Sequence, residues 1–218
     1  MTRLLKKEFS LCLHPTAPLF LLLSALVLTP NYPYSVNFFY TTLGIFFICM
    51  TGRENHDIPF TMTLPVSRRQ LVAGRMLLCA ILQGAQLALC AVLIALRPRI
   101  MEPLPNPVGM DANWALLGEG LLVFALFNAV FFPLWYKDVR KVGAPFLIAS
   151  AAVFLFILAA IASTYVLPFV RDQLDTPDPD HLPAKLLFIA VCALAYALSG
   201  YLSFRVSCRR FEAQDLQT

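Results

Sequence analysis

The fold is decided by apolar stretches such as residues 144–168, which read APFLIASAAVFLFILAAIASTYVLP without a single charge. A helix of roughly 18–20 apolar residues is long enough to cross a bilayer core of about 30 Å. Similar runs recur along the chain and predict six spans, at residues 17–29, 33–51, 74–96, 114–134, 144–168 and 184–204. The first is short on a strict count. The sequence therefore predicts an all-α integral membrane protein with six transmembrane helices, in one domain that covers residues 1–218.

The composition agrees with this class. Hydrophobic residues make up 59% of the chain and charged residues 14%, whereas a soluble domain is nearer half apolar and about a quarter charged. Six spans of about 20 residues each leave no room for a separate soluble domain. The net charge of +4 does not by itself indicate a nucleic-acid partner, and we expect none. The six cysteines form no C-x-x-C pair, so we expect reduced, packed thiols without a disulfide or metal site.

The distribution of Lys and Arg predicts the orientation, because basic residues are enriched in cytoplasmic loops. One predicted face carries 13 of the 17: Arg3, Lys6, Lys7, Arg53, Arg68, Arg69, Arg75, Lys137, Arg140, Lys141, Arg205, Arg209 and Arg210. The other face carries Arg97, Arg99, Arg171 and Lys185. We therefore expect both termini in the cytoplasm and an even number of spans.

The N-terminal stretch has an apolar side and a basic side. Leu4, Leu5, Phe9, Cys12 and Leu13 lie on one helical side, and Lys6, Lys7 and Ser10 lie mainly on the other. This pattern is typical of an amphipathic helix in the membrane interface, with its Lys side chains among the head groups. The alternative is a plain cytoplasmic extension of the first span. A cleaved secretory signal is disfavoured, because no small-x-small cleavage site follows.

The loop at residues 52–70, between the second and third spans, is polar at its start and then apolar. Glu54 and Asp57 are followed by Ile58, Phe60, Met62 and Leu64. A solvated connection has no reason to expose such apolar side chains, so we expect them to pack on this subunit or on a partner. Asn55 or Asp57 could cap a short helix, with Pro59 tolerated in its first turn.

The third span has a well-defined start. Ser67 and Gln70 stand three residues apart, as in a capping box, and Val66 and Leu71 are spaced for a hydrophobic staple. The run LPVSRRQLVAGR at residues 64–75, preceded by two acidic residues, resembles the signature of type-2 ATP-binding-cassette (ABC) permeases. The opening stretch LLKKEF is similar to the amphipathic N-terminal segment of the same family.

The resemblance implies a membrane-spanning permease subunit of an ATP-driven exporter. In that family the second cytoplasmic segment forms a coupling helix that sits in a groove of the ATPase. The resemblance therefore assigns the ATPase contact to Glu54, Asp57, Ile58, Phe60, Met62, Leu64 and Arg68. Residues 135–141, with Lys137 and Arg140, are a candidate second contact; the alternative is a positive-inside anchor with an interfacial aromatic pair.

The partners follow from the same resemblance. The chain contains no G-x-x-x-x-G-K-[ST] motif, so ATP and Mg²⁺ belong on a separate ATPase, expected in two copies, and this chain needs no cofactor of its own. A second permease, most simply an identical copy, completes the pathway. The small size is closest to the bacterial subgroup that exports amphipathic peptides such as phenol-soluble modulins. We therefore expect a hydrophobic or amphipathic peptide substrate and a place in a bacterial plasma membrane, in contact with lipid.

Polar residues are few within the predicted spans, and Gln83 and Gln86 share one helical side. Such amides more often join helices than bind substrate. Glu119 is a functional candidate as an intramembrane acid, although its place near the outer boundary would let it reach water. Aromatic residues on the second span suit an apolar cavity, with lipid-facing packing as the alternative. The candidate translocation cavity comprises Phe38, Phe39, Phe46, Gln83, Gln86, Glu119 and Asn128.

Two other function classes are weaker. An intramembrane enzyme needs a nucleophile–base pair or metal ligands at membrane depth. His14, His56 and His181 lie in loops or near helix ends, and neither G-x-S-x-G nor H-E-x-x-H is present. An ion-coupled carrier, or a membrane scaffold without an ATPase, is the alternative that we retain, although no internal repeat of the kind found in many such carriers is visible.

Overall fold

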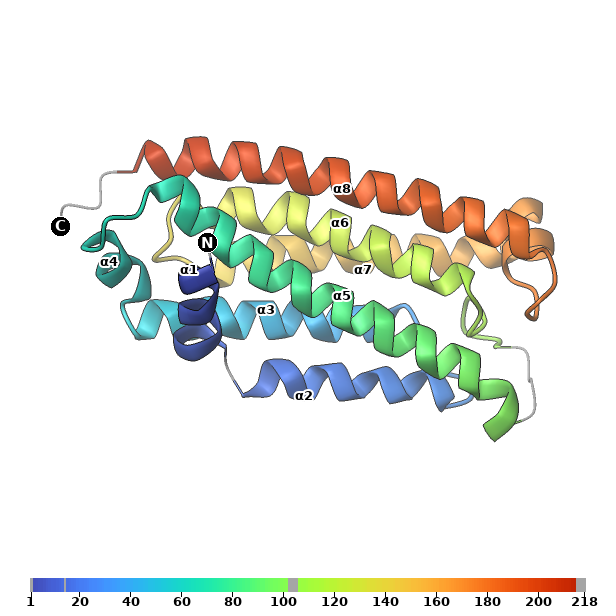
Figure 1. The fold of residues 1–218 in the computed structure, drawn as a ribbon. Coiled ribbons are helices and arrows are strands. Elements are labelled where there is room, and N and C mark those ends of the chain that lie inside the picture. The colour runs from blue at the N-terminus through green and yellow to red at the C-terminus, as the bar shows by residue number, and fades with distance from the viewer. Residues whose placement is uncertain (1, 14, 102–105, 215–218) are drawn as a thin grey trace.

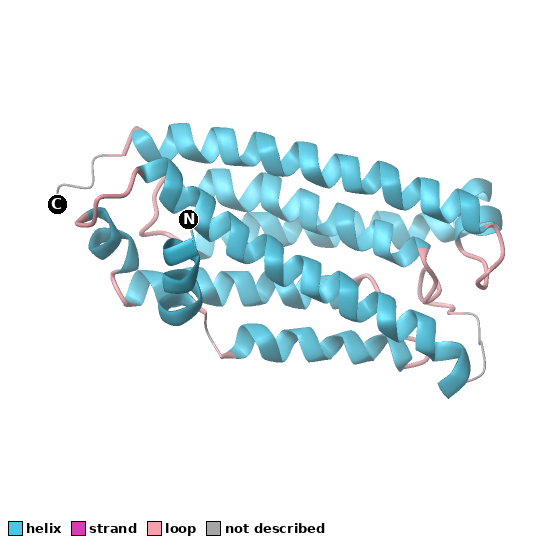
Figure 2. Ribbon diagram, in the orientation of Figure 1, coloured by secondary structure: helices cyan, strands magenta, loops and turns pink. Residues whose placement is uncertain are grey.

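The computed structural model describes residues 2–13, 15–101 and 106–214, and within these ranges every regular element is a helix (Figure 1, Figure 2). The helices are α1 (Thr2–Lys7), α2 (Thr16–Leu22), α3 (Val36–Glu54), α4 (Asp57–Met62), α5 (Arg68–Ile100), α6 (Ala115–Trp135), α7 (Gly143–Val166) and α8 (Leu182–Glu212). Three short segments with other helical pitches are η1 (Glu8–Cys12), η2 (Leu23–Leu28) and η3 (Val170–Leu174). The all-α prediction is confirmed for the described residues, and His14 lies outside them.

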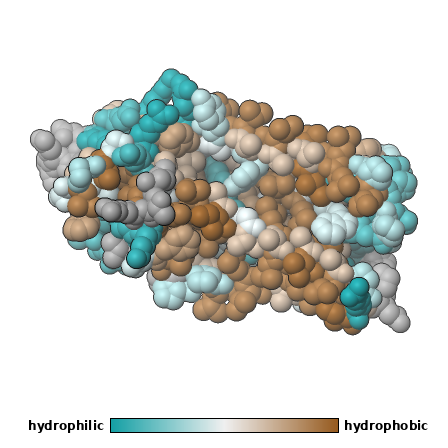
Figure 3. All heavy atoms as spheres, viewed as in Figure 1, coloured by the Kyte–Doolittle hydropathy of each residue, from teal (hydrophilic) through white to brown (hydrophobic). Residues whose placement is uncertain are grey.

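Four helices in the described ranges are long and apolar enough to cross a membrane, namely α5, α6, α7 and α8. They correspond to the last four predicted spans. On the face shown in Figure 3, hydrophobic atoms gather along the middle of the molecule and hydrophilic atoms gather toward its two ends. Most of the residues of α7 and α8 are not buried within this chain, which suits surfaces that face lipid or another subunit.

The first predicted span is a shorter apolar helix, Thr16–Leu28, made of α2 and η2. At the rises of an α-helix and a 3₁₀-helix it is about 22 Å long, less than a bilayer core. Pro15 and Pro18 explain where it begins, because proline is best accommodated in the first turn of a helix. The helix therefore does not extend back to residues 9–13.

The second predicted span becomes α3, which starts at Val36 and has Arg53 and Glu54 in its last turn. These charges and the polar residues of its first half lower its mean hydropathy, so α3 is not among the four clear membrane-length helices. The described residues thus contain helices of membrane length and composition for four of the six predicted spans. The spans at 17–29 and 33–51 stay predictions.

The bundle is built around α6, the most buried of the four membrane-length helices. Two glycines let its neighbours approach closely. A Cβ atom added at Gly118 would lie 2.6 Å from the ring of Phe188 on α8, and one at Gly120 would lie 2.6 Å from the ring of Phe38 on α3. Small residues at such contacts are the usual means of close helix packing in membranes.

Both termini lie at one end of the bundle, beside α1 and α4 (Figure 1). We call this the α4 end; it also contains residues 136–142, between α6 and α7, and the last turn of α8. The opposite end, called the far end, contains residues 29–35 and 167–181. Termini on one side are what an even number of membrane passes requires.

The start of α5 confirms the predicted capping box. The Ser67 hydroxyl accepts a hydrogen bond from the backbone N–H of Gln70 at 3.2 Å, and the Gln70 side-chain oxygen accepts one from the N–H of Ser67 at 2.9 Å. Both bonds satisfy donors that a helix N-terminus otherwise leaves unpaired. This fixes where the 33-residue helix α5 begins, directly after the segment that contains α4.

Candidate functional site

The short helix α4 exists because the chain turns sharply at His56, whose φ of +50° is left-handed. Pro59 falls in the first turn of α4, as the sequence predicts. His56 occupies the N-cap position and makes no side-chain capping bond, so neither Asn55 nor Asp57 is the N-cap residue. Asp57, the first helical residue, instead directs its carboxylate to the inside of the protein.

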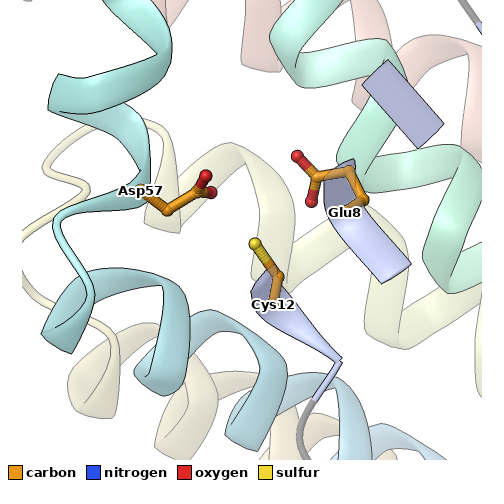
Figure 4. A group of neighbouring side chains, drawn as sticks. All are labelled: Glu8, Cys12 and Asp57. Atoms are coloured by element: carbon orange, nitrogen blue, oxygen red, sulfur yellow. The ribbon is translucent and has the colours of Figure 1, made fainter. Parts of the chain in front are cut away.

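A buried group of four charges joins α4 to α5 and to the N-terminal segment. We call Lys7, Glu8, Asp57 and Arg75 the Arg75 cluster. The Arg75 guanidinium donates from Nε to Glu8 Oε2 and from Nη2 to Asp57 Oδ2, each at 2.5 Å. Lys7 Nζ donates to Asp57 Oδ1 at 2.5 Å and lies 2.8 Å from Glu8 Oε1. The Glu8 and Asp57 side chains point toward one another from η1 and α4 (Figure 4).

The Arg75 cluster has no net charge and is almost completely buried. Glu8, Asp57 and Arg75 are at most 2% exposed, and two acids face two bases. Burying an unpaired charge is costly, so removal of any one member would strand another. Burial alone would raise the pKa of Asp57, but Arg75 and Lys7 outweigh it and hold that pKa below its ordinary value. Asp57 therefore stays ionised and bound.

The lysine is held in the same way. Burial lowers the pKa of Lys7, but hydrogen bonds to Asp57 and Glu8 outweigh this effect and raise it. The sequence places Lys7 on the polar side of an interfacial helix, among head groups. The structure instead turns its ammonium inward to Asp57 and Thr61, while Lys6 stays exposed.

Three potential metal ligands, Glu8, Cys12 and Asp57, lie together in this cluster, with ligand atoms within 4.8 Å of one another. Their charges are already compensated, because Arg75 and Lys7 bind the two carboxylates. Burial also raises the pKa of the Cys12 thiol, so it stays protonated and accepts a bond from Arg75 Nη2 at 3.1 Å. Two cations in place make this arrangement an ion cluster and disfavour a metal centre.

Some of the predicted ATPase-contact residues in the loop at residues 52–70 are exposed, and others are buried. Phe60 is 55% exposed and Leu64 is 43% exposed, and Glu54 is exposed as well. In contrast, Asp57 is 2% exposed and Ile58 is 7% exposed, so neither presents a free side chain to a partner. Asp57 is taken up by the ion cluster. Met62 is partly buried against the hydrophobic core.

Arg68 also differs from the expectation of a partner contact. Its Nη1 donates to the backbone carbonyls of Phe211, Glu212 and Gln214 at 2.8, 3.0 and 2.7 Å. Its guanidinium also lies 5.6 Å from the centre of the Phe211 ring. A helix C-terminus leaves its last carbonyls without intrahelical donors, so Arg68 caps α8. It thereby ties the start of α5 to the end of α8.

Lys137 and Arg140 lie exposed at the α4 end, in the turn that joins α6 to α7. Asp138 pairs with Arg140 at 3.2 Å and with Lys141 at 3.4 Å. Together with part of α4 these residues line a pocket of about 930 Å³. The α6–α7 turn and α4 therefore lie side by side, as they must if both contact one ATPase.

The candidate cavity residues are largely used to hold helices together. Gln83 and Asn128 exchange two amide hydrogen bonds, at 2.9 and 3.0 Å, and Tyr196 donates to Gln83 at 2.7 Å. Gln86 donates to Asn37 at 3.4 Å. These contacts join α5 to α6, α8 and α3, which is the bonding interpretation that the sequence favours for the two glutamines.

Glu119 and the phenylalanines are also packed within the chain. Glu119 is 3% exposed and accepts a hydrogen bond from Ser35 at 2.6 Å. Phe38 is fully buried against Phe124, and Phe39 and Phe46 are partly buried against Phe146. Neither of the two pockets described in this structure is lined by all seven predicted cavity residues. Of the seven, Asn128 lines the pocket of about 440 Å³ between α5, α6 and α8.

The fold and these contacts define a multi-pass helical membrane protein whose α4 end is fixed by a buried ion cluster. The model of the ABC-2 family transporter protein family matches residues 3–210. The chain therefore belongs to that family, of membrane-spanning transport subunits that are not themselves catalytic, which confirms the resemblance to type-2 ABC permeases. Membership implies association with an ABC ATPase and with another permease. No curated protein and no solved structure gives a significant match.

Proposed function

We propose that this chain is the permease subunit of an ATP-driven exporter and is coupled through α4 to a separate ATPase, present in two copies. A second, identical permease completes the pathway, and each chain contributes six spans with both termini in the cytoplasm. The proposed substrates are hydrophobic or amphipathic peptides, and the proposed location is a bacterial plasma membrane. ATP and Mg²⁺ act on the ATPase alone.

The proposed coupling role rests on one observation: one side of α4 is bound to the Arg75 cluster and another side is exposed. Phe60 of α4 is exposed, and so is Leu64, two residues after the end of the helix. Asp57 and Thr61, four residues apart, face the Arg75 cluster, where Asp57 binds Arg75 of α5. Movement of a partner bound to the exposed side of α4 is therefore transmitted to the start of α5, because breaking the buried ion pair would leave its charges unpaired.

The test uses Phe60→Asp in the permease, co-expressed with a candidate P-loop ATPase partner. A carboxylate at this exposed position removes apolar contact and adds a desolvation cost, so we expect at least tenfold less ATPase to co-purify. Phe169→Asp is the matched control, since Phe169 is 60% exposed at the far end. Undiminished co-purification and hydrolysis with Phe60→Asp would rule out the contact.

The retained alternative is an ion-coupled carrier or a scaffold without an ATPase. One observation favours the carrier: the Oε2 atom of Glu119 is buried without a hydrogen-bond partner among the described residues. An intramembrane acid of this kind is a common proton site. Transport by the purified chain under a proton gradient, without any ATPase, would favour this alternative.

A further inference from the structure

The pocket of about 930 Å³ at the α4 end adjoins the proposed ATPase contact and shares Lys137 and Arg140 with its candidate second part. It lies between α4, the turn at residues 136–142 and the start of α7. Ile58 and Met62 line it from α4, whereas the exposed Phe60 and Leu64 do not. The helix therefore has three distinct sides: one toward the Arg75 cluster, one toward the pocket and one toward the outside.

The rim of this pocket is strongly basic. Arg53, Lys137, Arg140 and Lys141 line it, and Asp138 is the one carboxylate among its described lining residues. The Arg140 and Lys141 side chains are each 77% exposed and share Asp138 between them, which leaves an excess of positive charge. Arg53 is 3.9 Å from Glu54 in a loose, exposed pair. Such a rim attracts an anion.

The wall of the pocket is apolar and continues onto the outer surface of α7. Ala144 and Ile148 line the pocket one helical turn apart, and Ile148 is 54% exposed. Leu155, two turns further along the same side, is 68% exposed. Because α7 is a membrane-length helix with most of its residues not buried in this chain, this surface is suited to lipid.

We propose that the pocket binds one anionic phospholipid. Its phosphate lies at the rim beside Lys137 and Arg140, and an acyl chain follows Ala144 and Ile148 along α7. Basic pockets at the ends of transmembrane helices bind anionic head groups in this way. A free phosphate would gain nothing from the apolar wall. An acidic protein segment would gain nothing from the continuation of that wall along a membrane-facing helix.

The test measures thermal stabilisation of the purified chain in detergent by phosphatidylglycerol, by phosphatidylcholine with the same acyl chains, and by inorganic phosphate. We expect phosphatidylglycerol to raise the Tm by several degrees and the other two to raise it by less than half as much. Equal shifts for the two lipids would overturn the charge assignment. An equal shift with phosphate alone would show a free-phosphate site and overturn the lipid assignment.

Paired variants locate the site. Lys137→Gln with Arg140→Gln removes two rim charges from exposed positions, and we expect the apparent affinity for phosphatidylglycerol to fall about tenfold. Arg205→Gln with Arg209→Gln removes two exposed charges at the same end that do not line the pocket, so it should leave that affinity nearly unchanged. Equal losses in both pairs would indicate a general surface effect and would contradict the pocket. Circular dichroism and gel filtration check that each variant is folded.

Discussion

At the residue scale, Arg75 is the side chain on which the α4 end depends. Its guanidinium binds Glu8 and Asp57, and its other side lies against Gly52, where an added Cβ atom would be 3.1 Å from Nη1. A side chain at position 52 would therefore press on the guanidinium and displace it from its two carboxylates. Buried ion pairs often contribute no more stability than an apolar core would, but these pairs join α4, α5 and the N-terminal segment in one arrangement.

The first prediction at this scale concerns Asp57→Asn. The change keeps the shape but leaves Glu8 as the one carboxylate facing both Arg75 and Lys7, so one buried positive charge is uncompensated. We therefore expect a loss of about 3–5 kcal/mol of stability, seen as a lower Tm in detergent. Asp138→Asn is the control, because Asp138 pairs with exposed Arg140 and Lys141 and such pairs contribute about 0–1 kcal/mol.

The pH dependence of that loss has a definite sign. The pKa of Asp57 is lower in the folded protein than its ordinary value of 3.8, so its contribution is fully present above that value. It is lost only as the pH falls through the lowered pKa of the folded state. The difference in Tm between wild type and Asp57→Asn is therefore constant from pH 5 to pH 8. A difference that vanishes by pH 5 would show that the carboxylate is not paired.

The sequence could not predict the Arg75 cluster, for reasons that particular residues make clear. Arg75 stands near the end of a predicted span, where a basic residue is usually an anchor at the head groups. Glu8 stands between Lys7 and Phe9 in a segment with an amphipathic pattern. Each charge has an ordinary local explanation, and only the fold brings them to 2.5 Å. The available signal was a lone acid and a lone base within largely apolar stretches.

At the element scale, local sequence signals performed well wherever the structure depends on near neighbours. The capping box at Ser67 and Gln70 and the place of Pro59 in α4 are both found as predicted. The four later spans match α5 to α8 within a few residues at most ends. However, α8 runs on to Glu212, because its last turn is capped by Arg68 from another helix. Such a contact, 143 residues away along the chain, leaves no local pattern.

This cap yields a prediction for Arg68→Gln. The variant loses charge-assisted bonds to the last carbonyls of α8, each of which contributes about 1 kcal/mol or somewhat more. We expect faster amide hydrogen exchange over residues 205–212 with little change in α6. Arg209→Gln, an exposed change on α8 itself, is the matched control. Unchanged exchange over this segment in Arg68→Gln would mean that the cap does not hold the helix end.

At the scale of the whole molecule, family membership and the arrangement of the α4 end support the proposed coupling. The chain is a membrane-spanning member of the ABC-2 transporter family, and its termini, α4 and the α6–α7 turn gather at one end of the bundle. Composition and apolar runs were sufficient to predict the class and the helical fold. They could not separate residues that face a partner from residues that face the interior. Asp57 and Phe60 both belong to α4, and only the fold shows that the charged side chain is buried and the apolar one is exposed.

The most direct measurement of the central claim is photo-cross-linking in cells from a reactive amino acid placed at position 60, with position 169 as the control. If α4 seats in the ATPase, position 60 gives a covalent product that contains a P-loop ATPase, and position 169 gives none. A product from position 60 that contains only a second copy of this chain, or no product at all with the ATPase co-expressed, would contradict the account.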